Sequence, residues 1–386
     1  MPAGSLASPK NLIKKAVSNE SGTTSAVRLA TLDGSRHFAR RFTELVSSKE
    51  DLRMIRVHTL GLAVAALVLS IQFSLGQNRG ISVAPILWAD PGDIPARDLF
   101  WGPGGQDHQP ALPVEFLAED LKGTSPKFEV RDSEGKKWTA KLGLEAKPEI
   151  AAARLLWAVG YSANENYFVP NLQIKNMPAA LRRGQDLAGH DGNVPNVRLQ
   201  RHPDAYKRVG NRNWRHNPFH GTREFNGLRV MMGLIGNWDL KDENNAVLDK
   251  EKGGAAQLYE VSDVGASIGA PGKSYNDRLS KGNLRVYQRT RLISHVHRDY
   301  IDLNFPKCPP LSELFEFEWL FFFHQLNIRW MGKHIPREDA KWIGSLLSQL
   351  TPQHISDAFR AAGYSPYEVQ AYSHAVVSRI EELKGL

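Results

Sequence analysis

The sequence predicts an α+β protein with two lobes, a β-rich one followed by a helical one. Between residues 121 and 203, apolar and polar side chains alternate in short runs separated by turns. This period of two is typical of strands. Beyond residue 310 the pattern favours helices, and Ser365–Glu368 forms a capping-box sequence with proline at the first helical position. Strands first and helices later favour two packed α+β lobes, at 121–203 and 204–386.

The β-rich lobe opens with a predicted hairpin. Phe128 and Val130 alternate with polar residues, a turn follows at 132–135, and Trp138 and Ala140 alternate again. A helix is expected next, opened by Pro148, continuing through Val159 and ended by Gly160. Two further strands are expected at Tyr167–Ile174 and Val197–Leu199.

The helical lobe begins with a polar connection. Residues 204–221 are dense in Arg, Asn and Gly. An amphipathic helix should follow, with one apolar face made by Phe225, Leu228, Met232 and Ile235. A short strand is expected to end at Val261–Asp263, and Thr351-Pro352 should start a later helix.

An apolar segment precedes both lobes. Residues 60–75 are almost entirely apolar or small, Arg53 and Arg56 precede them, and Ser74-Leu75-Gly76 follows. A basic start, an apolar centre and a small-residue end predict a signal peptide or single membrane anchor at 54–76; a buried core helix is the alternative. Residues 1–53 should be a disordered extension, and 77–120 an extended arm. The folded part is then extracytoplasmic, touching a membrane only through 58–76 if the segment is uncleaved.

The net charge of +8 is unevenly placed. Residues 1–76 contain ten Lys/Arg against five Asp/Glu, so the remainder carries little net charge. We therefore expect no nucleic-acid partner. Cys308 is the single cysteine, which excludes an intramolecular disulfide.

A lysine and a glutamate form the first candidate pair. Lys141 lies in the second hairpin strand and faces away from Ala140 and Leu142. An ammonium there needs water or an anion. Glu149, in the first turn of the next helix, is a suitable partner. The alternative is a surface lysine and a glutamate that merely stabilises a helix start.

The loop at 237–245 is the more specific signal. It follows the amphipathic helix and contains Asp239, Lys241 and Asn244. Asp239 has the chemistry to accept a proton from a nucleophilic hydroxyl, and Lys241 to neutralise a transferred phosphoryl group. The Asn244 amide oxygen suits Mg²⁺. A polar helix-capping loop is the alternative.

A second acidic residue follows the short strand. Asp263 begins an Asp-Val-Gly sequence ending at Gly265, and small residues come after it. A carboxylate at this point is suited to hold a metal ion, although a plain turn also fits the pattern.

Asp239-Leu240-Lys241-x-x-Asn244 and Asp263-x-Gly265 resemble the catalytic-loop and metal-binding motifs of the protein-kinase-like superfamily. They are most similar to the divergent bacterial branch that includes HipA-like kinases; phosphoinositide kinases are more distant. The resemblance covers roughly residues 120–300 and implies a two-lobed protein-kinase-like fold. It implies that Asp239 is the catalytic base and Lys241 neutralises phosphate. Asn244 and Asp263 then bind Mg²⁺ or Mn²⁺, and Lys141, anchored by Glu149, binds ATP or another nucleotide.

The sequence also departs from that family. No G-x-G-x-x-G loop precedes Lys141, Asn237 replaces the usual histidine, and no Ala-Pro-Glu segment follows Gly265. The remaining candidate for a phosphate cover is Gly123-Thr124-Ser125. These differences leave the hydroxyl acceptor unspecified.

Two other functions fit parts of the pattern. One is a catalytically silent kinase-like protein that binds a nucleotide, glycan or protein. The other is a metal-dependent hydrolase using Asp239, Asp242 and Asp263. The near-P-loop at 267–274 is interpreted as a Gly-rich loop like an activation segment. The pair His295 and His297 is interpreted as solvated, and the basic aromatic run from 198 to 215 as a solvated linker between the lobes.

Overall fold

The computed structural model describes residues 84–123, 125–189, 191–202, 205–250, 256–269, 281–305 and 319–386. The predicted extension at 1–53, the predicted signal or anchor at 54–76 and Cys308 lie outside these residues. No helix in the described ranges is long and apolar enough to span a membrane. Ser82–Leu386 form one compact unit, to which the following description applies.

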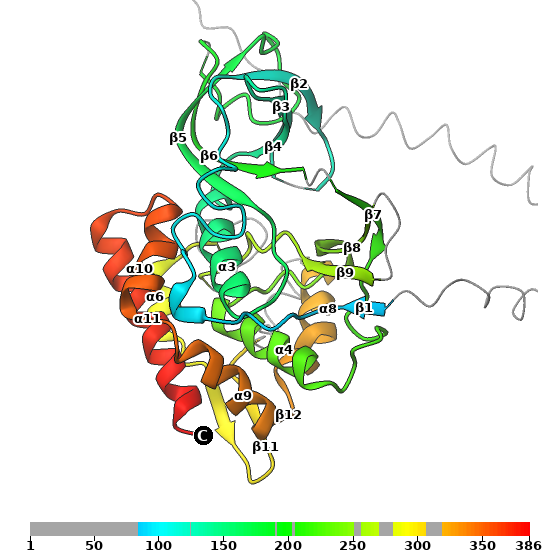
Figure 1. Ribbon diagram of the computed structural model, residues 1–386, viewed down its shortest axis with the longest axis vertical. Coiled ribbons are helices and arrows are strands. Elements are labelled where there is room, and N and C mark those ends of the chain that lie inside the picture. Colours follow the sequence, from blue (N-terminus) through cyan, green and yellow to red (C-terminus); the bar gives the residue numbers. More distant parts are fainter. Residues whose placement is uncertain are drawn as a thin grey trace, which may run out of the picture. The chain divides into compact units, whose positions relative to one another are not determined.

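Five strands close into a small barrel, drawn at the top of Figure 1. Their order around the barrel is β2-β3-β4-β6-β5. The strands are β2 (Val114–Asp120), β3 (Lys127–Arg131), β4 (Lys137–Lys141), β5 (Asn166–Lys175) and β6 (Asn193–Arg201). Inward side chains such as Phe128, Trp138 and Leu172 are fully buried and form a hydrophobic core of their own. This interior confirms the β-rich part that the alternating pattern predicted.

The predicted hairpin is β3 and β4. The two strands pair antiparallel, with Val130 opposite Trp138 and Lys127 opposite Lys141. Asp132 fixes the turn, because one carboxylate oxygen accepts from the amides of Glu134 and Lys136 and the other accepts from the Trp138 indole at 2.8 Å.

A second sheet has the order β1-β9-β8-β7. Its strands are β1 (Ala84–Ile86), β7 (Tyr206–Asn211), β8 (Asn245–Lys250) and β9 (Ala256–Val261). β8 and β9 are antiparallel neighbours, while β1 pairs parallel with β9. The predicted polar connection at 204–221 therefore contains a strand that the sequence did not predict, β7, whose backbone pairs with β8 although its side chains are mostly exposed.

The predicted arm at 77–120 also needs correction, because β2 belongs to the barrel. Before β2, the chain passes over helix α3 (Ala146–Ala158). Among the described residues before β2, β1 is the one strand. The Trp88 indole donates to the carbonyl of Val159 at 2.7 Å. The Arg97 guanidinium stacks on Trp157 at 4.6 Å. The arm is thus anchored to the helix that carries Glu149.

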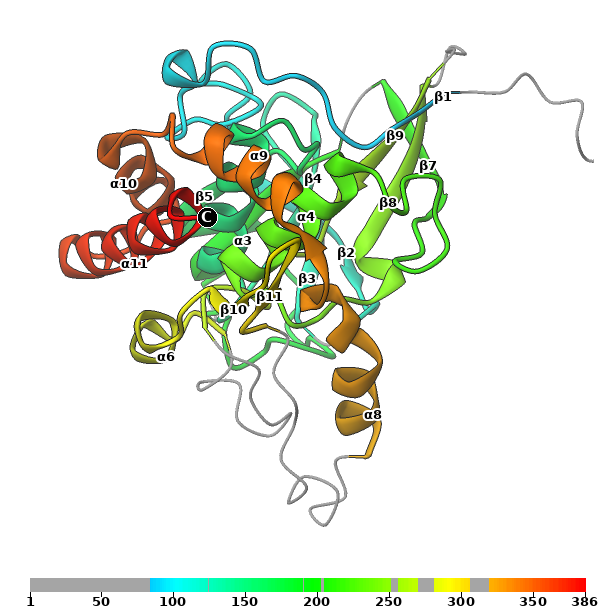
Figure 2. The same ribbon diagram turned by 90° about the horizontal axis from the view of Figure 1, so that it is seen from below.

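Helices make up most of the remaining described chain. α3 contacts β5, β6 and α10, and α4 packs on α9; Figure 2 shows α9, α10 and α11 from below. The helices are α3, α4 (Arg223–Ile235), α6 (Leu284–Arg289), α8 (Trp319–Ile328), α9 (Arg337–Leu347), α10 (Pro352–Ala361) and α11 (Pro366–Lys384), with 3₁₀ turns at Ile94–Ala96, Asp242–Asn244 and Arg329–Gly332. A small sheet contains β10 (Ile293–Val296), β11 (Tyr300–Leu303) and β12 (Ile335–Pro336).

The helical part has a second, larger hydrophobic core. The predicted apolar face of α4 lies in it, since Phe225, Leu228, Met232 and Ile235 are all buried. Capping boxes at Thr351 and Ser365 start α10 and α11 as expected. Two separate cores, one inside the barrel and one among the helices, agree with the predicted order of strands and then helices.

Candidate active site

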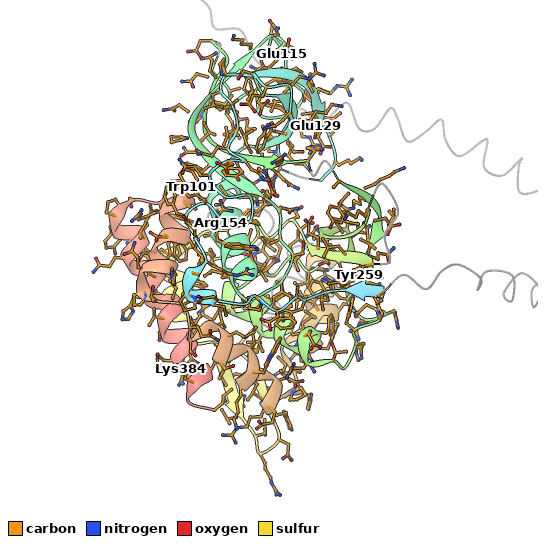
Figure 3. All side chains as sticks on the ribbon, in the orientation of Figure 1. Trp101, Glu115, Glu129, Arg154, Tyr259 and Lys384 are labelled. Atoms are coloured by element: carbon orange, nitrogen blue, oxygen red, sulfur yellow. The ribbon has the colours of Figure 1, made fainter. Side chains whose placement is uncertain are left out.

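One cleft of ≈ 1170 Å³ contains all six side chains singled out from the sequence. On one side it is lined by alternate residues of β3, β4 and β6, on the other by β8, β9 and the loops around them. In Figure 3, Glu129 marks the barrel side, and Tyr259 marks strand β9. The six predicted residues in the lining are Lys141, Glu149, Asp239, Lys241, Asn244 and Asp263.

Lys141 ends β4 and points into the cleft. Its neighbours Ala140 and Leu142 are buried in the barrel core, as the strand alternation predicted. The Lys141 ammonium is 2.9 Å from a Glu149 carboxylate oxygen and 2.6 Å from an Asp263 oxygen. Lys141 is only 2% exposed, so its charge is compensated almost entirely by protein carboxylates.

A third carboxylate in this cluster, that of Glu145, was missed in the sequence. Its oxygen lies 2.6 Å from the Lys141 ammonium, and its other oxygen lies 2.7 Å from the ammonium of Lys281. Glu145 directly precedes α3, after a turn in which Gly143 has φ 85°. An i,i+4 Lys–Glu pair across a strand-to-helix turn is not a recognised sequence pattern, which explains why the turn geometry was needed to find it.

The charges in this cluster stabilise one another. Burial alone lowers the pKa of a lysine, but Glu149, Asp263 and Glu145 together raise the pKa of Lys141 above its usual value. Burial likewise opposes ionisation of Glu145, yet Lys141 and Lys281 lower its pKa well below the usual range. The Lys141 ammonium and the Glu145 carboxylate are therefore charged near neutral pH.

Glu149 connects Lys141 to the barrel wall. It is 1% exposed, and its second oxygen accepts from the Arg198 guanidinium at 3.0 Å. Arg198, on β6, is also buried and donates to Asn166 on β5. The ion pair expected between Lys141 and Glu149 is thus present, and Arg198 fixes the orientation of its carboxylate.

Asp263 lies two residues after the end of β9 and has an unusual backbone conformation. Its φ of 48° is left-handed, which aspartate tolerates better than most residues. The side chain is 46% exposed, so one face of the carboxylate remains open to the cleft. Desolvation raises the pKa of Asp263, but the charge and the hydrogen bond of Lys141, together with the charge of Arg198, outweigh it, so the net pKa is lowered.

The loop after α4 places Asp239, Lys241 and Asn244 together. The Lys241 ammonium is 2.8 Å from Asp239 Oδ1. The Asn244 amide donates to the Asp239 carbonyl at 2.7 Å and to its carboxylate at 3.3 Å. Lys241 is 53% exposed, so its ammonium has freedom to contact a ligand. These three side chains form one short hydrogen-bonded unit at the cleft.

Buried residues hold this loop in shape. Gly236 ends α4 with φ 67°, and the Asn237 amide then accepts the Asp239 backbone N–H through Oδ1 at 3.1 Å. Asn237 is almost fully buried, as is Leu240. Asn237, which stands where the resembled family has histidine, therefore braces the backbone next to Asp239.

Asp242 has a structural role. Its carboxylate accepts the backbone N–H of Trp214 at 2.9 Å and the Asn213 side-chain amide. It is not among the residues that line the cleft. Among the described residues, no group of three or more His, Cys, Asp or Glu side chains is arranged to hold a metal ion.

The candidate phosphate cover lies at the cleft mouth. Gly123 and Ser125 line the cleft together with Lys122, in the turn between β2 and β3. Thr124 lies outside the described residues. Two of the three residues of the candidate cover therefore line the cleft.

The other segments noted in the sequence have separate roles. Arg212 is buried and stacks on Trp214 at 4.1 Å, and Arg215 stacks on Trp330 at 5.2 Å, so the basic aromatic run is divided among internal contacts. The rings of His295 and His297 stack with centroids 6.3 Å apart at the exposed β10–β11 hairpin. The near-P-loop is described only as far as residue 269.

No family model matches this chain, and no curated protein matches it. Solved structures that are similar include the Helicobacter pylori proinflammatory kinase CtkA, with 11% identity, a TM-score of 0.37, and coverage of 71% of this chain and 94% of the other. The Golgi casein kinase has 13% identity and a TM-score of 0.29, covering 75% of this chain and 78% of its own. The Rio2 kinase from Chaetomium thermophilum, in a complex with ADP, Mg²⁺ and phosphoaspartate, has 12% identity and a TM-score of 0.26, covering 69% and 72%. Because these TM-scores and identities are low, the function proposed below rests on the side chains of the cleft.

Proposed function

We propose that this chain is a kinase-like phosphotransferase that moves the terminal phosphoryl group of a nucleotide to a hydroxyl group of a protein or small molecule. One observation carries the proposal. The cleft is lined by a buried ammonium, three carboxylates, an amide and an exposed lysine, which come from β4, α3, the loop after α4 and the loop after β9. Phosphoryl transfer requires this set of groups and little other protein chemistry.

Lys141 supplies the positive charge for the nucleotide phosphates. In this arrangement three carboxylates surround its ammonium, and Asp263 is the most exposed of them. A phosphate oxygen that enters the cleft replaces the Asp263 contact and leaves Glu149 in place. Glu149 and Arg198 then keep the ammonium directed at the phosphate, since a bound and buried carboxylate moves little.

The donor set fits Mg²⁺ or Mn²⁺. Asp263 provides an open carboxylate and Asn244 an amide on the same cleft, and both are the hard oxygen donors that Mg²⁺ prefers. Mg²⁺ commonly uses few protein ligands and completes its shell with phosphate oxygens and water, which agrees with the lack of a three-ligand cluster among the described residues. When bound, the ion neutralises phosphate charge.

Asp239 is the proposed base. Its carboxylate accepts the proton of the acceptor hydroxyl while the hydroxyl oxygen forms a bond to the terminal phosphorus. The bond from that phosphorus to the bridging oxygen breaks, and the nucleoside diphosphate leaves with the electron pair. Lys241, released from Asp239, stabilises the charge on the transferred group.

The proposal extends to location. The apolar segment at 54–76 and its basic flank support an extracytoplasmic enzyme. Fractionation of cells expressing the full chain, with a tag at the carboxyl terminus, tests this. Recovery of the protein in the cytoplasm, with residues 54–76 retained, counts against export.

Substitution of the two acids tests the chemistry. With full-length protein, labelled ATP, Mg²⁺ or Mn²⁺ and a mixture of protein and small hydroxyl acceptors, Asp239→Ala and Asp263→Ala should each lower transfer by about 100-fold or more. Asp249→Ala is the matched control, because Asp249 lies on β8 outside the cleft and accepts from Gln257. Transfer that survives both cleft substitutions contradicts the proposal.

A catalytically silent nucleotide-binding protein is the second candidate. The absence of a G-x-G-x-x-G sequence before Lys141 favours it, because such a loop would supply backbone amides to hold phosphates. Stabilisation by ATP and Mg²⁺ in thermal unfolding, together with no transfer to any acceptor or to water, identifies this alternative.

The hydrolase hypothesis loses support, since Asp242 is engaged with Asn213 and Trp214.

A further inference from the structure

The floor of the cleft carries one acid that the proposed phosphoryl chemistry does not use. Five residues form this floor. Ala246 and Leu248 occupy alternate positions of β8, Leu258 and Glu260 occupy alternate positions of β9, and Ser262 directly follows β9. Alternate residues of a strand share a face. Glu260 is the charged residue among these five, between Leu258 and Ser262 along the strand and opposite Ala246 on β8.

Glu260 is bound through one oxygen. Its Oε1 accepts from the Asn164 side-chain amide at 2.7 Å and from the Ser262 hydroxyl at 3.1 Å. Among the described residues, none donates to Oε2, and none forms an ion pair with the carboxylate. Since Glu260 lines the cleft, the second oxygen is the part of this side chain left to meet a ligand.

The position of Glu260 suits a nucleobase. Glu260 precedes Asp263 by three residues, about 10 Å of extended chain, which separates it from the phosphate end of the cleft. Above the floor, the barrel side presents Thr139, Gln200 and His202. Leu248 and Leu258 offer an apolar surface on which a flat base can lie.

We propose that Glu260 selects the base of the nucleotide by accepting a hydrogen bond from an exocyclic amino group of a purine. This inference rests on the proposed function, because it requires the phosphates to lie at Lys141. The amino group is the 6-amino group of adenine or the 2-amino group of guanine, and both present the same N–H donor. A carboxylate oxygen with no partner in a partly apolar cleft favours such a donor over a carbonyl.

Protonation should control this selection. Burial raises the pKa of Glu260 to about 7, against the hydrogen bonds from Ser262 and Asn164, which lower it. The nearby charges act weakly in opposite directions, Arg208 lowering the pKa and Glu165 raising it. Because Oε1 already accepts two donors, a proton added below pH 7 belongs on Oε2, where it meets the amino group as a second donor.

The substitution Glu260→Gln separates recognition from folding. The glutamine carbonyl oxygen keeps both donors, Asn164 and Ser262, so its NH₂ group takes the place of Oε2. The variant then repels an amino group at every pH and donates a hydrogen bond to a purine carbonyl. Glu165→Gln is the matched control, since Glu165 also lines the cleft but its carboxylate pairs with His108 at 2.9 Å.

The test is calorimetric binding of ATP, GTP, inosine triphosphate and purine riboside triphosphate to the full chain with Mg²⁺, at pH 8 and pH 6. At pH 8 the wild type should bind ATP about tenfold tighter than purine riboside triphosphate, or GTP about tenfold tighter than inosine triphosphate. The first result assigns the 6-amino group and the second the 2-amino group. The preference should shrink at pH 6, vanish in Glu260→Gln at both pH values, and persist at pH 8 in Glu165→Gln.

Other results overturn the inference in distinguishable ways. Equal binding of all four nucleotides by the wild type, or a preference that Glu260→Gln leaves intact, removes the role of Glu260 and leaves phosphate binding at Lys141 standing. Absence of binding by every nucleotide removes the proposed function and this inference together.

Discussion

Lys141 is the residue on which the charge balance of the cleft depends. Its buried ammonium contacts Glu145, Glu149 and Asp263, which differ in exposure. The two glutamates are nearly buried and fixed, whereas Asp263 is open to the cleft. The exposed partner is the one most easily exchanged for a phosphate, because its carboxylate is the easiest to rehydrate.

Replacing Glu149 tests the structural side of this cluster. Glu149→Gln leaves both Lys141 and Arg198 buried with less compensating charge, since Glu149 bonds to both. We expect a loss of about 3 kcal/mol or more in the free energy of unfolding, measured by urea denaturation. Glu338→Gln, which alters an exposed pair with Lys341, should change stability by less than about 0.5 kcal/mol. Equal stability of the two variants contradicts the assigned role of Glu149.

At the scale of elements, the start of α3 and the loop after β9 meet at Gly265. A Cβ atom built on Gly265 lies 2.8 Å from the Glu145 Cβ and 3.1 Å from one of its carboxylate oxygens. The glycine of the Asp-Val-Gly sequence is thus required by the close approach of Glu145 rather than by a positive φ. This contact couples the position of Asp263 to that of Lys141.

Gly265→Ala should therefore displace Glu145 from Lys141. We expect stability to fall by about 1–3 kcal/mol from overpacking, and phosphoryl transfer to fall roughly tenfold in kcat/KM. Gly210→Ala is the control, because no atom lies within 4 Å of a Cβ placed there. Thermal unfolding and the transfer assay measure the two effects. Unchanged transfer in Gly265→Ala argues against coupling between these elements.

For the molecule as a whole, the cleft cluster predicts how stability depends on pH. Glu145 and Asp263 have lowered pKa values, so their contribution is present above the usual carboxylate values of about 3.9 to 4.3 and is lost as pH falls through the lowered ones. Lys141 has a raised pKa, so its contribution is present below about 10.4 and is lost only at more alkaline pH. Glu260 has the opposite effect to the other acids, because its raised pKa destabilises the fold as pH rises from about 4.3 toward 7.

A comparison of variants isolates the cluster from the other acids. The difference in Tm between wild type and Glu145→Gln should be constant from pH 6 to pH 9. It should shrink progressively below about pH 4, as the stabilisation by the Glu145 carboxylate of the wild type is lost. Glu338→Gln should show no such trend. A difference that stays the same down to pH 2 contradicts the lowered pKa of Glu145.

The two hydrophobic cores could be anticipated in part. Alternation around Trp138 predicted the hairpin and the direction of Lys141, and the spacing from Phe225 to Ile235 predicted the buried face of α4. β7 was missed because its side chains are mostly exposed and it lacks the apolar alternation of a half-buried strand. β2 was missed because the apolar pattern over 114–120 is weak and Pro- and Gly-rich segments surround it.

The sequence by itself determined the order of Lys141, Glu149, Asp239, Lys241, Asn244 and Asp263 and the local elements that carry them. Periodicity, turn chemistry and caps act over a few residues, so a linear pattern records them. Only the tertiary structure decided that these six residues share a cleft, that Glu145, Arg198 and Lys281 complete the charge balance, and that Glu260 lies unpaired at Oε2 among the described residues. Those contacts join distant segments, such as Lys141 and Asp263, which lie 122 residues apart, and they depend on how the barrel, α3 and β9 pack together.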